Sequence, residues 1–176
     1  MSHAIASAPA RRRAGASFAA LRAVALSLLM LFAHGAGADP VAADQRLAIV
    51  KQNFTSLKQN YSIAKMQVQM GQTSPASVSF TLAKIQAQQM VSNLVILRND
   101  NQHTLDNGLY LNGAAQQQAL NYNDVAKSLA QQLQTRLLIL GMQPASQVDL
   151  VLADQSLTQL TLKVTQLEQA MIAAQQ

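Results

Sequence analysis

The sequence predicts an all-α protein: an antiparallel up-down four-helix bundle of long, coiled-coil-like helices, preceded by a cleavable signal peptide. Three observations lead to this prediction. Through most of residues 39–176, apolar residues recur at spacings of three and four, the period of a helix with one buried face. Gly, Pro and Asn residues interrupt that period at three places. A basic, then apolar, then small-residue stretch comes before it.

The first 38 residues have the organisation of a secretory signal peptide. Four Arg and no acidic residue precede the apolar run Ala23–Ala33, and Ala36-Gly37-Ala38 follows it. A helix of that run would rise only about 16 Å, too short for a hydrocarbon core of about 30 Å. We therefore expect cleavage after Ala38 rather than a retained anchor, and a periplasmic or secreted bacterial protein with no stable membrane span.

Removal of the leader changes the charge of the chain. The whole sequence has a net charge of +5, but residues 39–176 contain nine basic and eight acidic residues, a net charge of +1. The basicity therefore belongs to the leader and gives no support for binding to nucleic acid. The same 138 residues contain no Cys, so the single predicted domain must be stabilised by packing alone.

The first and last predicted helices have the clearest heptad spacing. The first ends at Gly71, and the last follows Gly141 and Pro144. A strand is the alternative for the last segment, because Leu160, Leu162 and Val164 alternate among Thr residues. Seven seam positions outweigh three alternating ones, so we predict a helix. The two seams consist of Leu47, Val50, Phe54, Leu57, Tyr61, Ala64 and Val68, and of Leu150, Ala153, Leu157, Leu160, Val164, Leu167 and Met171.

The second and third predicted helices are separated by an apolar loop. Thr73-Ser74-Pro75 is a start signal, a hydroxyl cap followed by Pro at the first helical position, and Asn107-Gly108 is a stop signal. Together the four helices are expected at about 42–70, 75–106, 114–140 and 145–174. The predicted inward residues are Phe80, Ala83, Ala87, Met90, Leu94, Leu97 and Asn101 in the second helix, and Tyr122, Val125 or Ala126, Leu129, Leu133 and Leu137 or Leu140 in the third.

Short connections favour antiparallel neighbours, and hence the four-helix bundle. Two extended hairpins that complete their cores on another copy or a partner are the alternative. Charges beside the two clear seams make the bundle specific. In antiparallel helices the flanking positions meet, which would place Lys65 near Asp154 and Lys51 near Glu168. The other interpretation of these lysines is a solvated helix face.

The sequence of residues 39–176 contains few residues that could support catalysis or hold a cofactor. It has one His, His103, and one Glu, which excludes a di-iron bundle built from several Glu and Glu-x-x-His pairs. A haem held by His103 and a Met stays open, although Met at seam spacing is usually core. No nucleophile elbow or Gly-rich phosphate loop is present. We predict no enzyme activity and no cofactor.

The loop residues Leu109, Tyr110 and Leu111 are the candidate contact site. They either fold over the end of the bundle or form a patch for a partner. The leading functional hypothesis is a non-enzymatic envelope protein that acts through helix-mediated association with protein partners, which can include itself. It would be a subunit or accessory of an assembly such as a secretion or conjugation system. The alternatives are a periplasmic chaperone-like or stress-binding protein, and a small haem or ligand carrier.

Overall fold

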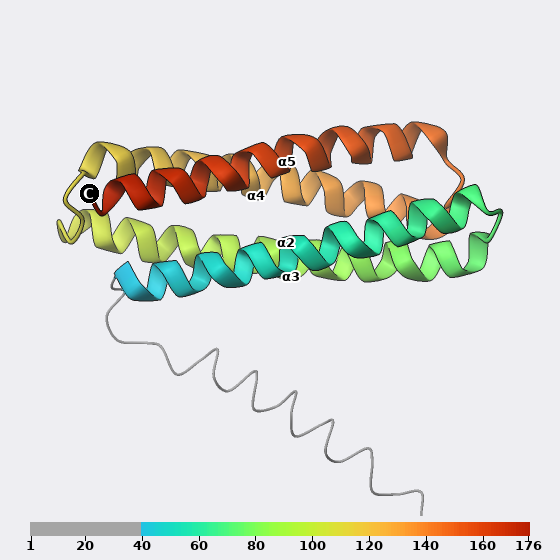
Figure 1. The fold of residues 1–176 in the computed structure, drawn as a ribbon, viewed down its shortest axis with the longest axis horizontal. Coiled ribbons are helices and arrows are strands. Elements are labelled where there is room, and N and C mark those ends of the chain that lie inside the picture. The colour runs from blue at the N-terminus through green and yellow to red at the C-terminus, as the bar shows by residue number, and fades with distance from the viewer. Residues whose placement is uncertain (1–39) are drawn as a thin grey trace, which may run out of the picture. The chain divides into compact units, whose positions relative to one another are not determined.

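The computed structural model describes residues 40–176, and the expected signal peptide lies outside these residues. The described chain forms four helices joined by three short connections (Figure 1). Each helix begins and ends within two residues of the predicted position. The helices are α2 (Pro40–Gln69), α3 (Thr73–Asp106), α4 (Gly113–Met142) and α5 (Gln147–Ala174). None of these helices is long and apolar enough to cross a membrane.

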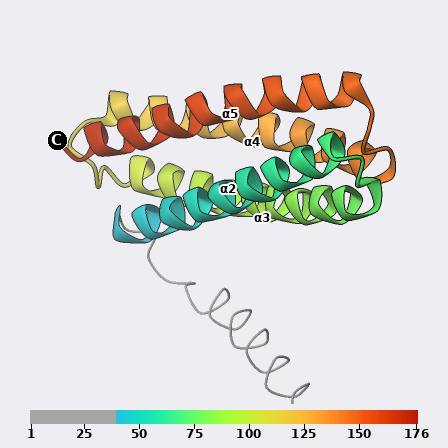
Figure 2. The same ribbon diagram turned by 45° about the vertical axis from the view of Figure 1, so that its right-hand side comes forward.

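The helices form the predicted antiparallel up-down bundle. Both views show α2 and α3 in one layer and α4 and α5 in the other (Figures 1 and 2). Consecutive helices pack closely, whereas the backbones of α2 and α5 approach each other at few positions. The α2–α3 and α4–α5 connections lie at one end, and the α3–α4 connection lies at the other (Figure 1). Three of the four helix interfaces therefore bring backbones close together, whereas the interface between α2 and α5 is made mainly by side chains.

The connections correct two details of the sequence prediction. The helix α3 begins at Thr73, because the Gln72 carbonyl accepts from the Ala76 N–H at 3.1 Å and Gln72 is the N-cap without a side-chain bond. The expected hydroxyl cap is therefore not made. Gly141 does not end the third helix, which continues to Met142. A Cβ built on Gly141 would lie only 3.3 Å from Thr81 Oγ1, so the glycine allows α3 and α4 to approach.

One predicted turn conformation is confirmed, and two helices have side-chain caps that the sequence did not predict. Gly108 has φ +60°, the left-handed conformation predicted for the residue that follows the second helix. At the start of α5, Ser146 is the N-cap, and its Oγ donates to Asp149 Oδ2 at 2.7 Å. The Asn112 side chain caps α4 by accepting from the Ala115 N–H at 3.0 Å. The Ser146 and Asn112 bonds cap the starts of α5 and α4 locally, whereas the end of α5 is bonded by the Asn112 N–H across the bundle.

One continuous apolar core runs along all four helices. The residues predicted for the seams of α2 and α5 are buried, apart from Val68 and Leu157, which are partly buried. In α4 the structure selects Ala126 over Val125, which is 43% exposed, and it buries both Leu137 and Leu140. The strand alternative for α5 is wrong, because Leu160 and Val164 face the core while Leu162 is 55% exposed.

Buried polar side chains join α3 to α4 near the α3–α4 connection. The predicted Asn101 is fully buried, and Asn123 is too. Asn123 Nδ2 donates to the Leu94 carbonyl at 2.9 Å, and Gln116 Nε2 donates to the Asn101 carbonyl at 2.9 Å. A shifted helix pairing would leave these amides without partners in an apolar core, which is costly. The network therefore opposes changes of register between α3 and α4.

Replacement of a core leucine should cost far more stability than replacement of an exposed one. Leu57 is fully buried, so Leu57→Ala should lower the free energy of unfolding by about 2–5 kcal/mol. Leu162→Ala, the matched control on the outside of α5, should change it by less than about 0.5 kcal/mol. Urea unfolding followed by circular dichroism measures both, and equal losses would contradict the core described above.

Candidate functional site

The structure divides the loop residues predicted as a contact site. Tyr110 is only 7% exposed and packs with Ala115 of α4 and Ala174 of α5. Leu109 is 46% exposed and Leu111 82% exposed. The loop is fixed to the end of α5, because the Asn112 N–H donates to the Ala174 carbonyl at 3.1 Å. Tyr110 therefore anchors the loop and leaves two leucines facing outward on a held backbone.

The second predicted set of site residues lies along α2 and α5. Lys65 Nζ lies 2.8 Å from Asp154 Oδ2, and Lys51 Nζ forms an ion pair with Glu168 Oε1. These are the two contacts that the positions of the charges predict. All four side chains are about one third to one half exposed, so each pair contributes modestly to stability. The two lysines connect α2 to α5, the neighbouring helices whose backbones approach each other at the fewest positions.

Tyr61 adds a buried polar contact to the same interface. Its hydroxyl oxygen lies 2.9 Å from Asp154 Oδ1 and 3.1 Å from the Leu150 carbonyl oxygen, and its one proton is shared between these two acceptors. Lys65 Nζ lies 5.6 Å from the centre of the Tyr61 ring. The centres of the Tyr61 and Phe80 rings are 5.9 Å apart. The heptad spacing predicts that Tyr61 faces inward but does not predict the contacts of its hydroxyl. Those contacts depend on how deeply the ring is buried beside α5.

Lys58, which lies between Lys51 and Lys65 on α2, has no acidic partner. The two ion pairs are 14 residues apart on both helices, so Lys58, midway on α2, faces the position of Thr161 on α5. Lys58 Nζ instead lies 4.8 Å from the centre of the Phe54 ring. Thr161 Oγ1 donates to the Leu157 carbonyl of its own helix at 2.8 Å. The row of ion pairs between α2 and α5 therefore lacks one carboxylate at its centre, opposite Lys58.

His103 does not fit the haem alternative. The residue lies in the last turn of α3 and is exposed. Met90 and Met171 are buried in the core, so an internal haem could not join either of them to His103 without rebuilding the helix. Among residues 40–176, no three His, Cys, Asp or Glu side chains gather where they could hold a metal ion. We therefore do not propose the haem carrier.

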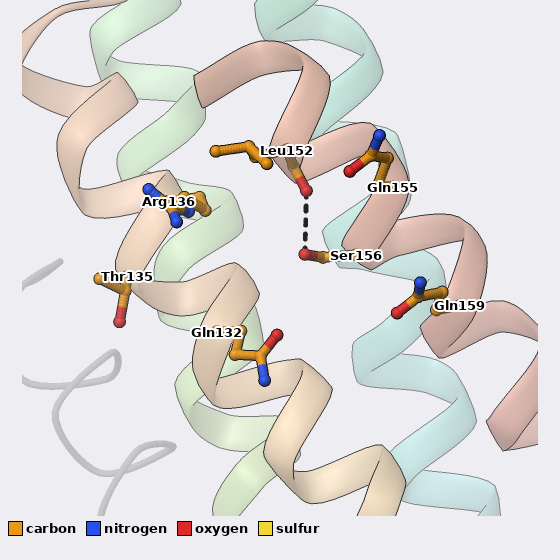
Figure 3. Close-up of a pocket in the computed structure, with 7 residues that line it drawn as sticks. All are labelled: Gln132, Thr135, Arg136, Leu152, Gln155, Ser156 and Gln159. Atoms are coloured by element: carbon orange, nitrogen blue, oxygen red, sulfur yellow. Dashed lines mark hydrogen bonds between the residues drawn. The ribbon is translucent and has the colours of Figure 1, made fainter. Parts of the chain in front are cut away.

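A groove of about 440 Å³ lies between α4 and α5, and three of its polar side chains, those of Thr135, Arg136 and Ser156, already have partners. Arg136 NH1 lies 3.2 Å from Asp149 Oδ1, and Ser156 Oγ donates to the Leu152 carbonyl at 2.9 Å. Glutamine side chains from both helices form most of the remaining lining (Figure 3). The lining has no nucleophile paired with a base, so we assign no chemistry to it. The lining residues are Gln132, Thr135, Arg136, Leu152, Gln155, Ser156 and Gln159.

Comparison of the chain with known protein families, curated proteins and solved structures finds no match. The site must therefore be interpreted from its own geometry. That geometry presents outward apolar side chains, which are a feature of association surfaces, whereas the paired charges join α2 to α5 within the bundle. Sequence analysis missed most of the outward apolar residues because the search followed the inward seam only. A search of the outward helical positions would have found them.

Completion of the charge row should stabilise the bundle. Thr161→Glu would place a carboxylate opposite Lys58, and we expect a gain of about 0.2–1 kcal/mol in the free energy of unfolding. Thr161→Gln, which has the same length and no charge, is the matched control. Urea unfolding at low and at high salt measures the difference between the two variants. A gain that is equal for both variants, or that does not fall with salt, would contradict the predicted contact.

Tyr61 should make the bundle sensitive to alkaline pH. Burial, the hydrogen bond to Asp154 and the charge of that carboxylate raise the pKa of Tyr61 above its ordinary value of about 10. The unfolded chain ionises Tyr61 near pH 10 while the folded chain keeps it neutral. Its contribution is therefore complete below about pH 10, and above it stability falls by up to about 1.4 kcal/mol per pH unit.

Urea unfolding from about pH 9 to about pH 11.5 tests this dependence. Tyr61→Phe should lower stability at neutral pH by about 0.5–1.5 kcal/mol, because it removes the hydroxyl bonds. The same variant should lose stability less steeply above pH 10 than the original chain. Tyr122→Phe is the control, because the Tyr122 ring is only partly buried. Parallel pH profiles for Tyr61→Phe and the original chain would contradict the assignment.

Proposed function

We propose that this chain is a non-enzymatic exported protein that acts by helix-mediated association, as a subunit or accessory of a bacterial envelope assembly such as a secretion or conjugation system. The supporting observation is that many large apolar side chains are exposed in addition to those that form the core. Leu111 and Leu109 project from an anchored loop, and further large apolar residues are exposed on all four helices. Apolar side chains that are exposed close together, as Leu109 and Leu111 are in one loop, are typical of association sites.

The leader supports the proposed compartment. Its basic, apolar and small-residue regions follow the order of a secretory signal peptide. The described helices contain no membrane span, so cleavage after Ala38 would release the helical domain into the periplasm or the medium. In this proposal the coiled-coil-like bundle works after export as a body that binds other proteins through its outer faces.

Mass spectrometry of the protein from fractionated bacterial cells tests export. The expected product starts at Asp39 and is found in the periplasm or the medium. Ala36→Leu together with Ala38→Leu should block cleavage, because the cleavage site requires small residues, and the precursor should accumulate. A product that retains Met1 and stays in the cytoplasm would exclude the proposed compartment.

Site-specific photo-crosslinking in intact cells tests association. A photo-reactive amino acid in place of Leu111 should capture a small set of partners in constant proportion, identified by mass spectrometry. The same amino acid in place of Gln89, an exposed polar position on α3, is the matched control and should capture much less. Equal capture at the two positions would argue against a specific contact through the loop.

A chaperone-like function is the second candidate, because exposed methionines favour it. Met66, Met70 and Met142 are all more than half exposed, and flexible thioethers adapt to many partners. The crosslinking experiment separates the two functions. A broad population of captured proteins whose composition changes with stress would favour the chaperone, and a constant set would favour the assembly subunit.

A further inference from the structure

The loop between α3 and α4 begins and ends with the same reactive pair of residues. Within residues 40–176, Asn is followed by Gly at two positions, Asn107-Gly108 and Asn112-Gly113, and both pairs are exposed. In an Asn-Gly pair the backbone nitrogen of Gly can attack the Asn side chain with little hindrance, because Gly has no side chain of its own. The local sequence does not distinguish the two pairs, so the structure around each pair decides which one reacts.

The reaction of an Asn-Gly pair is a deamidation. The Gly nitrogen gives its proton to water and bonds to the Asn carbon Cγ, the bond from Cγ to the amide nitrogen breaks, and ammonia leaves. Water then opens the resulting succinimide ring at either of its carbonyls, which yields aspartate or isoaspartate. Water is the only co-reactant. Two conditions favour the first step: a Gly N–H without an acceptor, and a peptide plane that can turn to bring this nitrogen beside Cγ.

The nitrogen of Gly113 meets the first condition. Gly113 is the first residue of α4, where an N–H has no acceptor within its own helix. No other acceptor for this N–H lies among residues 40–176. The side chain that it would attack is also activated, because Asn112 Oδ1 accepts from the Ala115 N–H at 3.0 Å, and this bond polarises the carbonyl.

The peptide plane between Asn112 and Gly113 can turn at low cost. The ψ of Asn112 is 89°, which holds the Gly113 nitrogen on the side away from the Asn112 side chain. Turning the plane over brings the nitrogen to the side of Cγ and gives Gly113 a positive φ, which glycine adopts readily. The turn breaks the bond from the Gln116 N–H to the Asn112 carbonyl. The Asn112 N–H keeps its bond to the Ala174 carbonyl, so the loop stays in place.

At the other pair, both reacting groups are already bonded. The Gly108 N–H donates to the Leu105 carbonyl at 3.1 Å. Asn107 Nδ2, the nitrogen that would leave, donates to the His103 carbonyl at 2.7 Å. Attack at Asn107 therefore requires two bonds to break, against one at Asn112. One additional hydrogen bond corresponds to a rate difference of about two- to tenfold.

We propose that Asn112-Gly113 is a deamidation site, which reacts in the folded chain faster than Asn107-Gly108. Both products place a carboxylate next to Leu111, which is 82% exposed. Aspartate at position 112 still caps α4. Isoaspartate adds one carbon to the main chain and so disturbs the bond to the Ala174 carbonyl. The modification goes beyond the proposed function, and it gives the loop a neutral form and a charged form.

Mass spectrometry of the purified protein, incubated at mildly alkaline pH and then digested with trypsin, tests the site. Both Asn-Gly pairs lie in the tryptic peptide 99–127, so its fragment ions assign the mass change to Asn107 or Asn112 within one peptide. In the folded chain, Asn112 should convert about two- to tenfold faster than Asn107. In concentrated urea the fold is lost, and the two pairs should convert at equal rates.

Gly113→Ala is the matched variant. A Cβ on Gly113 would lie 3.7 Å from Leu105 Cδ1, an ordinary contact, so circular dichroism should show the helical content of the original chain. Alanine rarely adopts the positive φ that the turned peptide requires, so conversion of Asn112 should slow by about tenfold or more while that of Asn107 stays unchanged. Three results would overturn the inference: no conversion of Asn112 in the folded chain, conversion of Asn107 at the same or a higher rate, or no slowing in Gly113→Ala.

Discussion

The bundle depends on a single apolar core that is continuous from one end of the helices to the other. The chain has no disulfide to limit the unfolded state, because it contains no Cys. Burial of Leu, Ala, Phe and Met side chains from all four helices must therefore supply the stability. Since every helix contributes one face only, none could keep its apolar seam from water alone, and the helices stabilise one another.

The interface between α2 and α5 differs from the other three in how rarely its two backbones approach each other. Consecutive helices approach closely, whereas α2 and α5 are joined by the Lys51–Glu168 and Lys65–Asp154 pairs and by the buried Tyr61 hydroxyl. Exposed ion pairs contribute little to stability but penalise pairings that bring like charges together. Their role is consistent with selecting which helix lies beside α2, while the core determines that the helices associate.

The outer surface separates into regions with different partners in prospect. The loop at 107–112 is held by Tyr110 and presents two leucines, and further large apolar side chains are exposed on all four helices. Between them, the helices are covered mainly by Gln, Thr and Ser. Such a surface is well hydrated without strong charge, and the exposed apolar side chains are the places where it departs from that composition.

Much of the fold follows from local information in the sequence. The three-four spacing determined the helices and their inward residues, since a regular helix repeats each face every seven residues. The positions of Lys51, Lys65, Asp154 and Glu168 were enough to predict their pairing, because antiparallel neighbours bring equivalent flanking positions together. The glycine at 108 similarly marked a helix end through its own backbone preference.

Other features were decided only by the tertiary structure. Gly141 resembles a helix stop in the sequence, yet α4 continues through it to Met142, where a Cβ would lie 3.3 Å from Thr81 Oγ1 of α3. The depth of Tyr61 and the burial of Asn123 depend on neighbours far away in the chain. The up-down topology brings the α2–α3 and α4–α5 connections to the same end of the bundle, and a local pattern contains no information about that meeting.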